Sequence, residues 1–68
     1  MKNPPSLTKV REALARAPRV AVKVALDSGA CWAFAVRVDE RRGDARVHID
    51  LAGARVVLTA DRVLEVAP

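Results

Sequence analysis

The sequence predicts a mainly β domain with one N-terminal α-helix, in which five short strands curl into a small barrel. Between residues 20 and 66, apolar residues alternate with polar or small ones in short runs, and the three glycines of the chain separate these runs. Before residue 18, apolar residues recur at helical spacing instead. A chain of 68 residues has room for one domain, which we place at residues 6–68.

The N-terminal segment predicts a disordered lead-in over residues 1–5 and a helix over residues 6–17. Ser6 is a candidate N-cap. Pro18 ends the helix because it disfavours a helical backbone at the residue before it. So short a helix is marginal alone and must dock on the strands through its apolar side. That side comprises Leu7, Val10, Leu14 and Ala17.

The remaining chain predicts the barrel, over about residues 19–67. Its strands are Val20–Leu26, roughly Cys31–Asp39, Ala45–Leu51, Ala54–Thr59 and Val63–Val66, with a single helical turn over Ala60–Arg62. A flat, open sheet of such strands would expose its edges, which favours curling into a barrel.

The second strand predicts that both aromatic side chains of the chain lie inside. Its even-numbered residues from Trp32 to Val38, Phe34 included, are expected on the core face, and its odd-numbered residues from Cys31 to Arg37 on the outer face. Proteins that bind single strands usually stack bases on aromatic side chains. Two buried rings cannot stack on bases, so only contacts to the nucleic-acid backbone are expected.

The basic charge is concentrated at the N-terminus. Residues 1–23 contain six basic residues and one acidic residue, whereas residues 24–68 contain six and seven. A basic segment attracts phosphate backbones through counterion release. The alternative explanation is compositional, because a chain rich in Ala, Arg and Val is expected from a GC-rich genome. The residues expected to contact nucleic acid are Lys9, Arg16, Arg19, Lys23, Arg37, Arg46 and Arg55.

The sequence gives little support for catalysis or for a cofactor. Cys31 is the only cysteine and His48 the only histidine, so neither a zinc site nor an intrachain disulfide is expected. Cys31 is expected to be a small packed residue and His48 a solvated one on an outer face. We therefore predict a protein that is not an enzyme and needs no metal or cofactor.

The second loop brings acidic and basic residues together. Arg41 and Arg42 are interleaved there with the acids Asp39, Glu40 and Asp44. The sequence predicts that these charges neutralise one another.

A cytoplasmic location is expected. Lys2, Lys9 and Arg11 interrupt any early apolar run that could act as a signal peptide. No stretch approaches the roughly 20 apolar residues that span a bilayer, so no membrane partner is expected. A single unpaired cysteine fits a reducing compartment.

Self-association is predicted from an apolar outer surface. Val57 lies on the outer face of the fourth strand, and the alanines of the second strand leave a smooth surface nearby. Such a patch on a small chain often marks an interface. Trp32 fits either the core or an anchor in that interface. We therefore expect a homo-oligomer, with a protein partner also possible.

The order of elements resembles the Sm-like fold, in particular the bacterial Sm-like RNA chaperones of the Hfq type. The likeness runs from Ser6 to Pro68 and includes the helix, the turn glycine Gly29 and the pair Val38–Asp39. The resemblance implies rings that bind RNA. The family's Tyr-Lys-His segment, which helps line its RNA pore, reads Thr59-Ala60-Asp61 here, so that pore contact is not carried over.

A second, local resemblance is to the type II dihydrofolate reductases, which are tetramers of SH3-like barrels. It covers residues 28–32 and residues 56–59. Val57 and Thr59 replace that family's active-site glutamine and tyrosine, so the activity is not carried over.

Two functional hypotheses follow from these patterns. The first is a non-enzymatic, oligomeric Sm-like or SH3-like barrel that contacts RNA or DNA backbones through its basic N-terminal helix. The alternative is a protein-interaction or oligomerisation module, such as an accessory factor of a mobile element, that does not bind nucleic acid.

Overall fold

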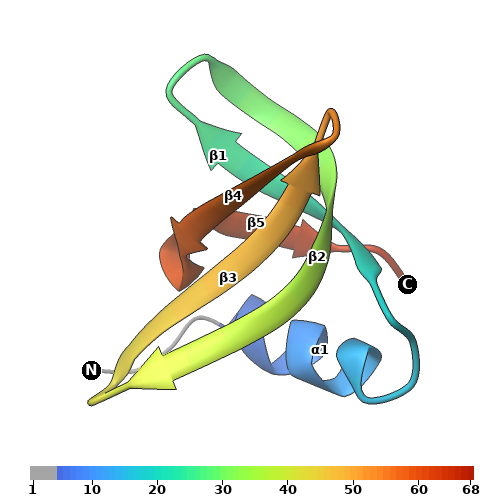
Figure 1. Cartoon of the computed structure of the whole chain (residues 1–68), viewed down its shortest axis with the longest axis vertical. Helices are drawn as coiled ribbons and strands as arrows, with labels where there is room; N and C mark the ends of the chain where they lie inside the picture. The colour runs from blue at the N-terminus through green and yellow to red at the C-terminus, as the bar shows by residue number, and fades with distance from the viewer. Residues whose placement is uncertain (1–4) are drawn as a thin grey trace.

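The computed structural model describes residues 5–68 as a mainly β fold, with one α-helix and five antiparallel strands in a single sheet (Figure 1). The elements in chain order are α1 (Pro5–Leu14), β1 (Val20–Leu26), β2 (Gly29–Arg41), β3 (Asp44–Leu51), β4 (Ala54–Thr59), the 3₁₀ turn η1 (Ala60–Arg62) and β5 (Val63–Val66). The strand order is β4-β3-β2-β1-β5. The mainly β class with one helix is confirmed, and β2 is longer at both ends than the sequence predicts.

Helix α1 ends earlier than predicted and has no Ser6 cap. Ser6 lies inside the first turn, and its hydroxyl donates a hydrogen bond to the carbonyl oxygen of Val63 at 3.0 Å. After Leu14 the chain tightens into a turn, in which the Arg16 amide donates to the carbonyl three residues before it. Except for Pro5, which begins the helix, the predicted lead-in lies outside the described residues.

The core lies between α1 and one face of the sheet, and it is aliphatic. Leu7 and Val10 of α1 are fully buried against the strands. The buried strand and turn residues are Val22, Val24, Ala33, Ala35, Ala45, Val47, Ile49, Ala60 and Val63. The alternation of β1 predicts one face that includes Val22 and Val24, and that of β3 predicts one that includes Val47 and Ile49; these residues are buried. No aromatic side chain of the described residues contributes to this core.

The inner and outer faces of β2 are the reverse of the prediction over its first half. Ala33 and Ala35 are buried, whereas Trp32 and Phe34 are 51% and 42% exposed. The expectation that both aromatic side chains lie inside is therefore wrong, and so is the expected alanine surface outside. Alanine suits the inner positions because α1 packs directly against β1, β2 and β5, which leaves little depth between helix and sheet.

The turn between β1 and β2 sets these faces. The sequence predicts a tight turn over residues 27–29. Leu26 instead pairs with Gly29, so the turn holds only residues 27–28 and is one residue shorter. Side chains alternate with a period of two, so a one-residue change in register transfers every side chain to the opposite face. A β-bulge at Val36 then reverses the faces again, and Val38 packs against the core as predicted.

The next two hairpins turn through a left-handed backbone. Arg42 and Gly43 have φ of 51° and 80°, and Ala52 and Gly53 have φ of 51° and 83°. Positive φ at both central residues is the pattern of type I′ turns, whose twist matches that of the flanking strands. Arg42 is thereby held at the tip of the β2–β3 turn.

Within the described residues, no helix combines the length and apolar character needed to cross a membrane.

Candidate nucleic-acid interface

Four of the seven basic residues predicted to contact nucleic acid lie in ion pairs on the outer face of the sheet. The pairs are Lys23–Glu65 at 3.8 Å, Arg37–Asp39 at 2.9 Å, Arg46–Asp44 at 3.1 Å and Arg55–Asp50 at 2.9 Å. Each carboxylate offsets the charge that its partner would present to a phosphate. The outer face of the sheet is therefore close to charge balance.

The other three predicted residues, Lys9, Arg16 and Arg19, form no ion pair with any residue in the described range 5–68. Lys9 and Arg16 line one groove of about 380 Å³ between α1 and the C-terminal residues 66–68. Glu12 is the acidic residue of that groove. Both cations are exposed, so their charge is available to an anion in solution.

The β2–β3 turn adds two cations that the sequence analysis set aside. Arg41 and Arg42 were expected to be neutralised by the acids around them, and this expectation is wrong for the described structure. Those acids, Asp39, Glu40 and Asp44, pair instead with Arg37, Arg11 and Arg46. Arg41 and Arg42 consequently form no ion pair within residues 5–68.

The ion pair between Arg11 and Glu40 places α1 beside the end of β2. Figure 1 shows the helix and the β2–β3 turn at the same end of the molecule, away from the β1–β2 hairpin. The helix and the turn therefore lie at the same end of the fold, with Arg11 on the side of α1 toward β2, and with Lys9 and Arg16 in the groove formed with residues 66–68. No local sequence pattern marks this arrangement, because it depends on a contact between residues 29 positions apart.

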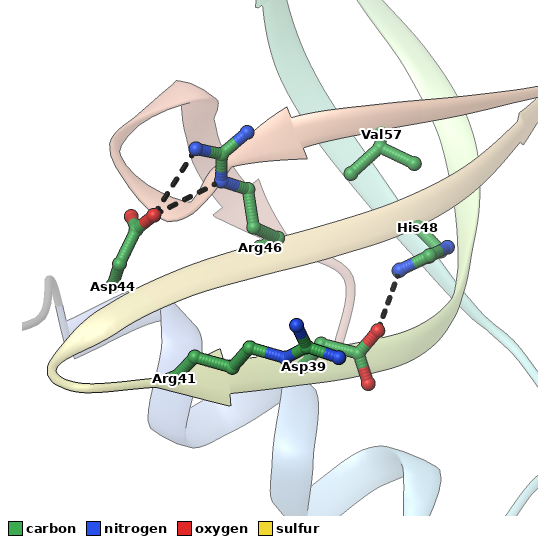
Figure 2. Close-up of a pocket in the computed structure, with 6 residues that line it drawn as sticks. All are labelled: Asp39, Arg41, Asp44, Arg46, His48 and Val57. Carbon is green, nitrogen blue, oxygen red and sulfur yellow. Dashed lines mark hydrogen bonds and ion pairs between the residues drawn. The ribbon is translucent and has the colours of Figure 1, made fainter.

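A shallow hollow of about 310 Å³ opens on the outer face of the sheet (Figure 2). Its lining residues are Asp39, Arg41, Asp44, Arg46, His48 and Val57. Figure 2 shows Asp39 directed toward His48, and Asp44 toward Arg46. His48 Nε2 donates a hydrogen bond to Asp39 Oδ2 at 2.9 Å. The hollow thus contains two paired carboxylates, Asp39 and Asp44, and one cation, Arg41, that forms no ion pair within residues 5–68.

Asp39 is held in its charged form. Partial desolvation alone would raise the pKa of this carboxyl, but hydrogen bonds and charge from His48 and Arg37 outweigh it, so the pKa lies below its usual value. An ionised Asp39 accepts from both neighbours at neutral pH. This behaviour is typical of a structural ion pair on a sheet surface.

Cys31 and His48 lie on opposite faces of the sheet. Cys31 pairs with the buried Val24 and packs against the core, so its predicted place on the outer face is wrong. His48 pairs with the exposed Val57. His48 is half-buried rather than solvated, since it contacts Asp39. The two side chains therefore cannot act together as a nucleophile and base. Within residues 5–68, no group of three His, Cys, Asp or Glu side chains is arranged to hold a metal ion.

The outer face of the sheet also presents the two aromatic side chains. Trp32 lies opposite Lys23 of β1, and Phe34 lies opposite Ala21. The guanidinium carbon of Arg19 lies 4.5 Å from the centre of the Phe34 ring, within the range of a cation–π interaction. This cluster is not predicted from the sequence, because the alternation along β2 favours burial of both rings.

The two residues predicted to form an interface, Val57 and Trp32, are both exposed, at 47% and 51%. They do not share a continuous apolar surface. The charged side chains of β3, including His48 and Asp50, lie between β4 and β2 on that face.

Comparison of the chain with protein-family models, with curated proteins and with solved structures gives no match.

Proposed function

We propose that this protein binds nucleic acid through the phosphate backbone. The binding surface comprises Lys9, Arg16, Arg41 and Arg42, called here the basic surface, and none of these four cations forms an ion pair within residues 5–68. The observation that supports it is the distribution of ion pairs: carboxylates balance the cations of the sheet and leave those of the basic surface unbalanced. Cations without a carboxylate partner release counterions from a nucleic acid when they bind its phosphates.

The proposal includes an Sm-like or SH3-like small barrel as the scaffold. Two features support this class. β5 pairs with β1 at one edge of the sheet, and only the single turn η1 separates β5 from β4 at the other edge. Arg62 of η1 also donates to the carbonyl oxygen of Ala25 at 3.4 Å, which draws the two edges together. We further propose that the protein acts in the cytoplasm, without a cofactor and without catalysis.

The salt dependence of binding tests the proposed function. A fluorescently labelled single strand of about 12 nucleotides, titrated with protein and followed by anisotropy, should bind at about 50 mM salt and weaken about 50-fold at about 200 mM if all four cations contact phosphates. A neutral peptide-nucleic-acid strand of the same sequence is the control and should not bind. Absence of binding to the charged strand at low salt would rule out the proposed function.

A second candidate function is assembly of several copies or docking of a protein partner. Its support is that β4 and β5 are both edge strands and that each carries an exposed apolar residue, Val57 or Leu64. Native mass spectrometry should then show an oligomer for the wild type, and Val57→Asp should be folded but monomeric. A wild type that stays monomeric at high concentration would contradict self-association.

A further inference from the structure

We propose that Trp32 and Phe34 form a platform on which two bases of a single-stranded nucleic acid stack. This inference rests on the proposed function, because the basic surface supplies the backbone attraction and the platform supplies selectivity for unpaired bases. The first observation is where the aromatic residues lie. The chain has one tryptophan, one phenylalanine and no tyrosine, and both rings are about half exposed on the outer face of β2.

This placement is unusual for so small a domain. A chain of 68 residues has a thin core, and the buried residues of this one are all aliphatic. Burial of either ring would therefore add to the apolar area that stabilises the fold. The fold instead places alanines inside and both rings outside. A pair of large rings kept at the surface indicates a use there.

The spacing of the rings suits two separate bases. Trp32 and Phe34 are two positions apart on one strand, so they point to the same face with their attachment points about 7 Å apart. That separation leaves room for one base beside each ring, with Arg19 lying over one face of Phe34. Stacking on such rings tolerates any sequence, because every base has a π-face.

The charges around the rings favour an anionic ligand. Arg19 lies over Phe34 and has no carboxylate partner among the described residues. Lys23 lies opposite Trp32, and its charge is offset by Glu65 at 3.8 Å, so Arg19 is the cation that remains available beside the rings. The one acid beside the rings, Asp50 opposite Phe34, is engaged by Arg55. Cations next to stacking rings are the combination found in proteins that bind single strands.

The apolar area is too small for a contact between two copies of the chain. Aromatic side chains bury about 150–250 Å² each, so two half-exposed rings offer roughly 200 Å² in all. A stable interface needs about 800 Å² from each partner. Val57, the other exposed apolar residue of this sheet face, is separated from the rings by the charged residues of β3. The area matches two bases better than a protein surface.

Trp32 is itself the probe for the test, since it is the only tryptophan and the chain has no tyrosine. Oligothymidylate and oligouridylate of about 12 nucleotides should each quench its fluorescence. An abasic sugar-phosphate strand of equal length should bind more weakly and leave the fluorescence unchanged. A duplex should bind without quenching.

Variants then measure the platform with labelled strands. Trp32→Ala and Phe34→Ala should each weaken binding of oligothymidylate by about 5- to 150-fold, with an unchanged salt slope. Trp32→Phe should restore most of the affinity. Leu64→Ala is the matched control, since Leu64 is also 51% exposed but lies on β5, and it should bind like the wild type. Circular dichroism checks that every variant folds.

The outcomes separate this inference from the proposed function. If Trp32→Ala and Phe34→Ala bind oligonucleotides as tightly as the wild type, the platform is overturned and the basic surface stands. The same conclusion follows if the wild type binds the abasic strand as tightly as oligothymidylate. No binding to any strand at low salt overturns both. A change in sedimentation of Trp32→Ala, with nucleic-acid affinity unchanged, would instead assign the rings to a contact between copies.

Discussion

Replacement of Ile49 by alanine should remove much of the stability of this fold. Ile49 is fully buried at the centre of the sheet, where it pairs with Ala35 of β2 and Val56 of β4. Loss of a buried isoleucine side chain typically costs about 2–5 kcal/mol, because a cavity remains where the methyl groups were. A domain of this length has roughly 3–10 kcal/mol in total. Urea unfolding followed by circular dichroism measures the loss.

Leu64→Ala is the control for this prediction, since Leu64 is 51% exposed. Its free energy of unfolding should stay within about 0.5 kcal/mol of the wild type. If both variants lost similar stability, Ile49 would not occupy the centre of the core.

Reversal of two charges, Lys9 on α1 and Arg16 in the turn that follows it, in Lys9→Glu/Arg16→Glu, should abolish most of the proposed nucleic-acid binding. The two residues provide half of the basic surface, so the slope of log K against log salt should fall by about half. Each phosphate contact on a single strand adds about 0.7 to the slope of log K against log salt. If wild type and variant have equal affinity at about 1 M salt, the loss of two contacts makes the variant bind about 50- to 100-fold more weakly than the wild type at about 50 mM salt. Anisotropy titrations at several salt concentrations give both quantities.

The matched control is Arg37→Glu/Arg55→Glu, which changes the net charge of the chain by the same amount. Arg37 and Arg55 are already balanced by Asp39 and Asp50 on the sheet. This variant should lose much less affinity and keep most of the salt slope. Equal losses in the two double variants would mean that net charge alone, rather than the basic surface, determines binding.

The strands whose faces the sequence predicts correctly are those with one clearly apolar side. In β1 and β3, branched aliphatic residues alternate with alanine or charged residues, so only one face can be buried. β2 offers no such choice. Its odd positions hold cysteine and alanine, and its even positions hold tryptophan, phenylalanine and valine. Periodicity alone favours burial of the larger, even-numbered side chains. The two-residue turn before β2 and the bulge at Val36 instead place Ala33 and Ala35 in the core.

The candidate site was predictable to the extent that its charges are local. Lys9 and Arg16 stand out because the N-terminal segment has few acids. Arg41 and Arg42 were hidden by neighbouring acids that pair with other cations. Asp39 and Asp44 each pair with an arginine two positions away on the same strand, and Glu40 pairs with Arg11 of α1. The two pairs within a strand follow from period-two alternation, which puts residues two apart on one face. The Arg11–Glu40 pair depends on how α1 docks against β2, and the order of charges along the chain does not encode that contact.

The strand order also determines when parts of the chain meet during folding. β1 to β4 pair with their neighbours in sequence through two-residue turns, so these hairpins close with little loss of chain entropy. β5 must return to β1, and the hydrogen bond from Ser6 to Val63 joins residues 57 positions apart. Such distant contacts form late. We therefore expect α1 and β5 to dock together as the last step, after the four-stranded meander has formed.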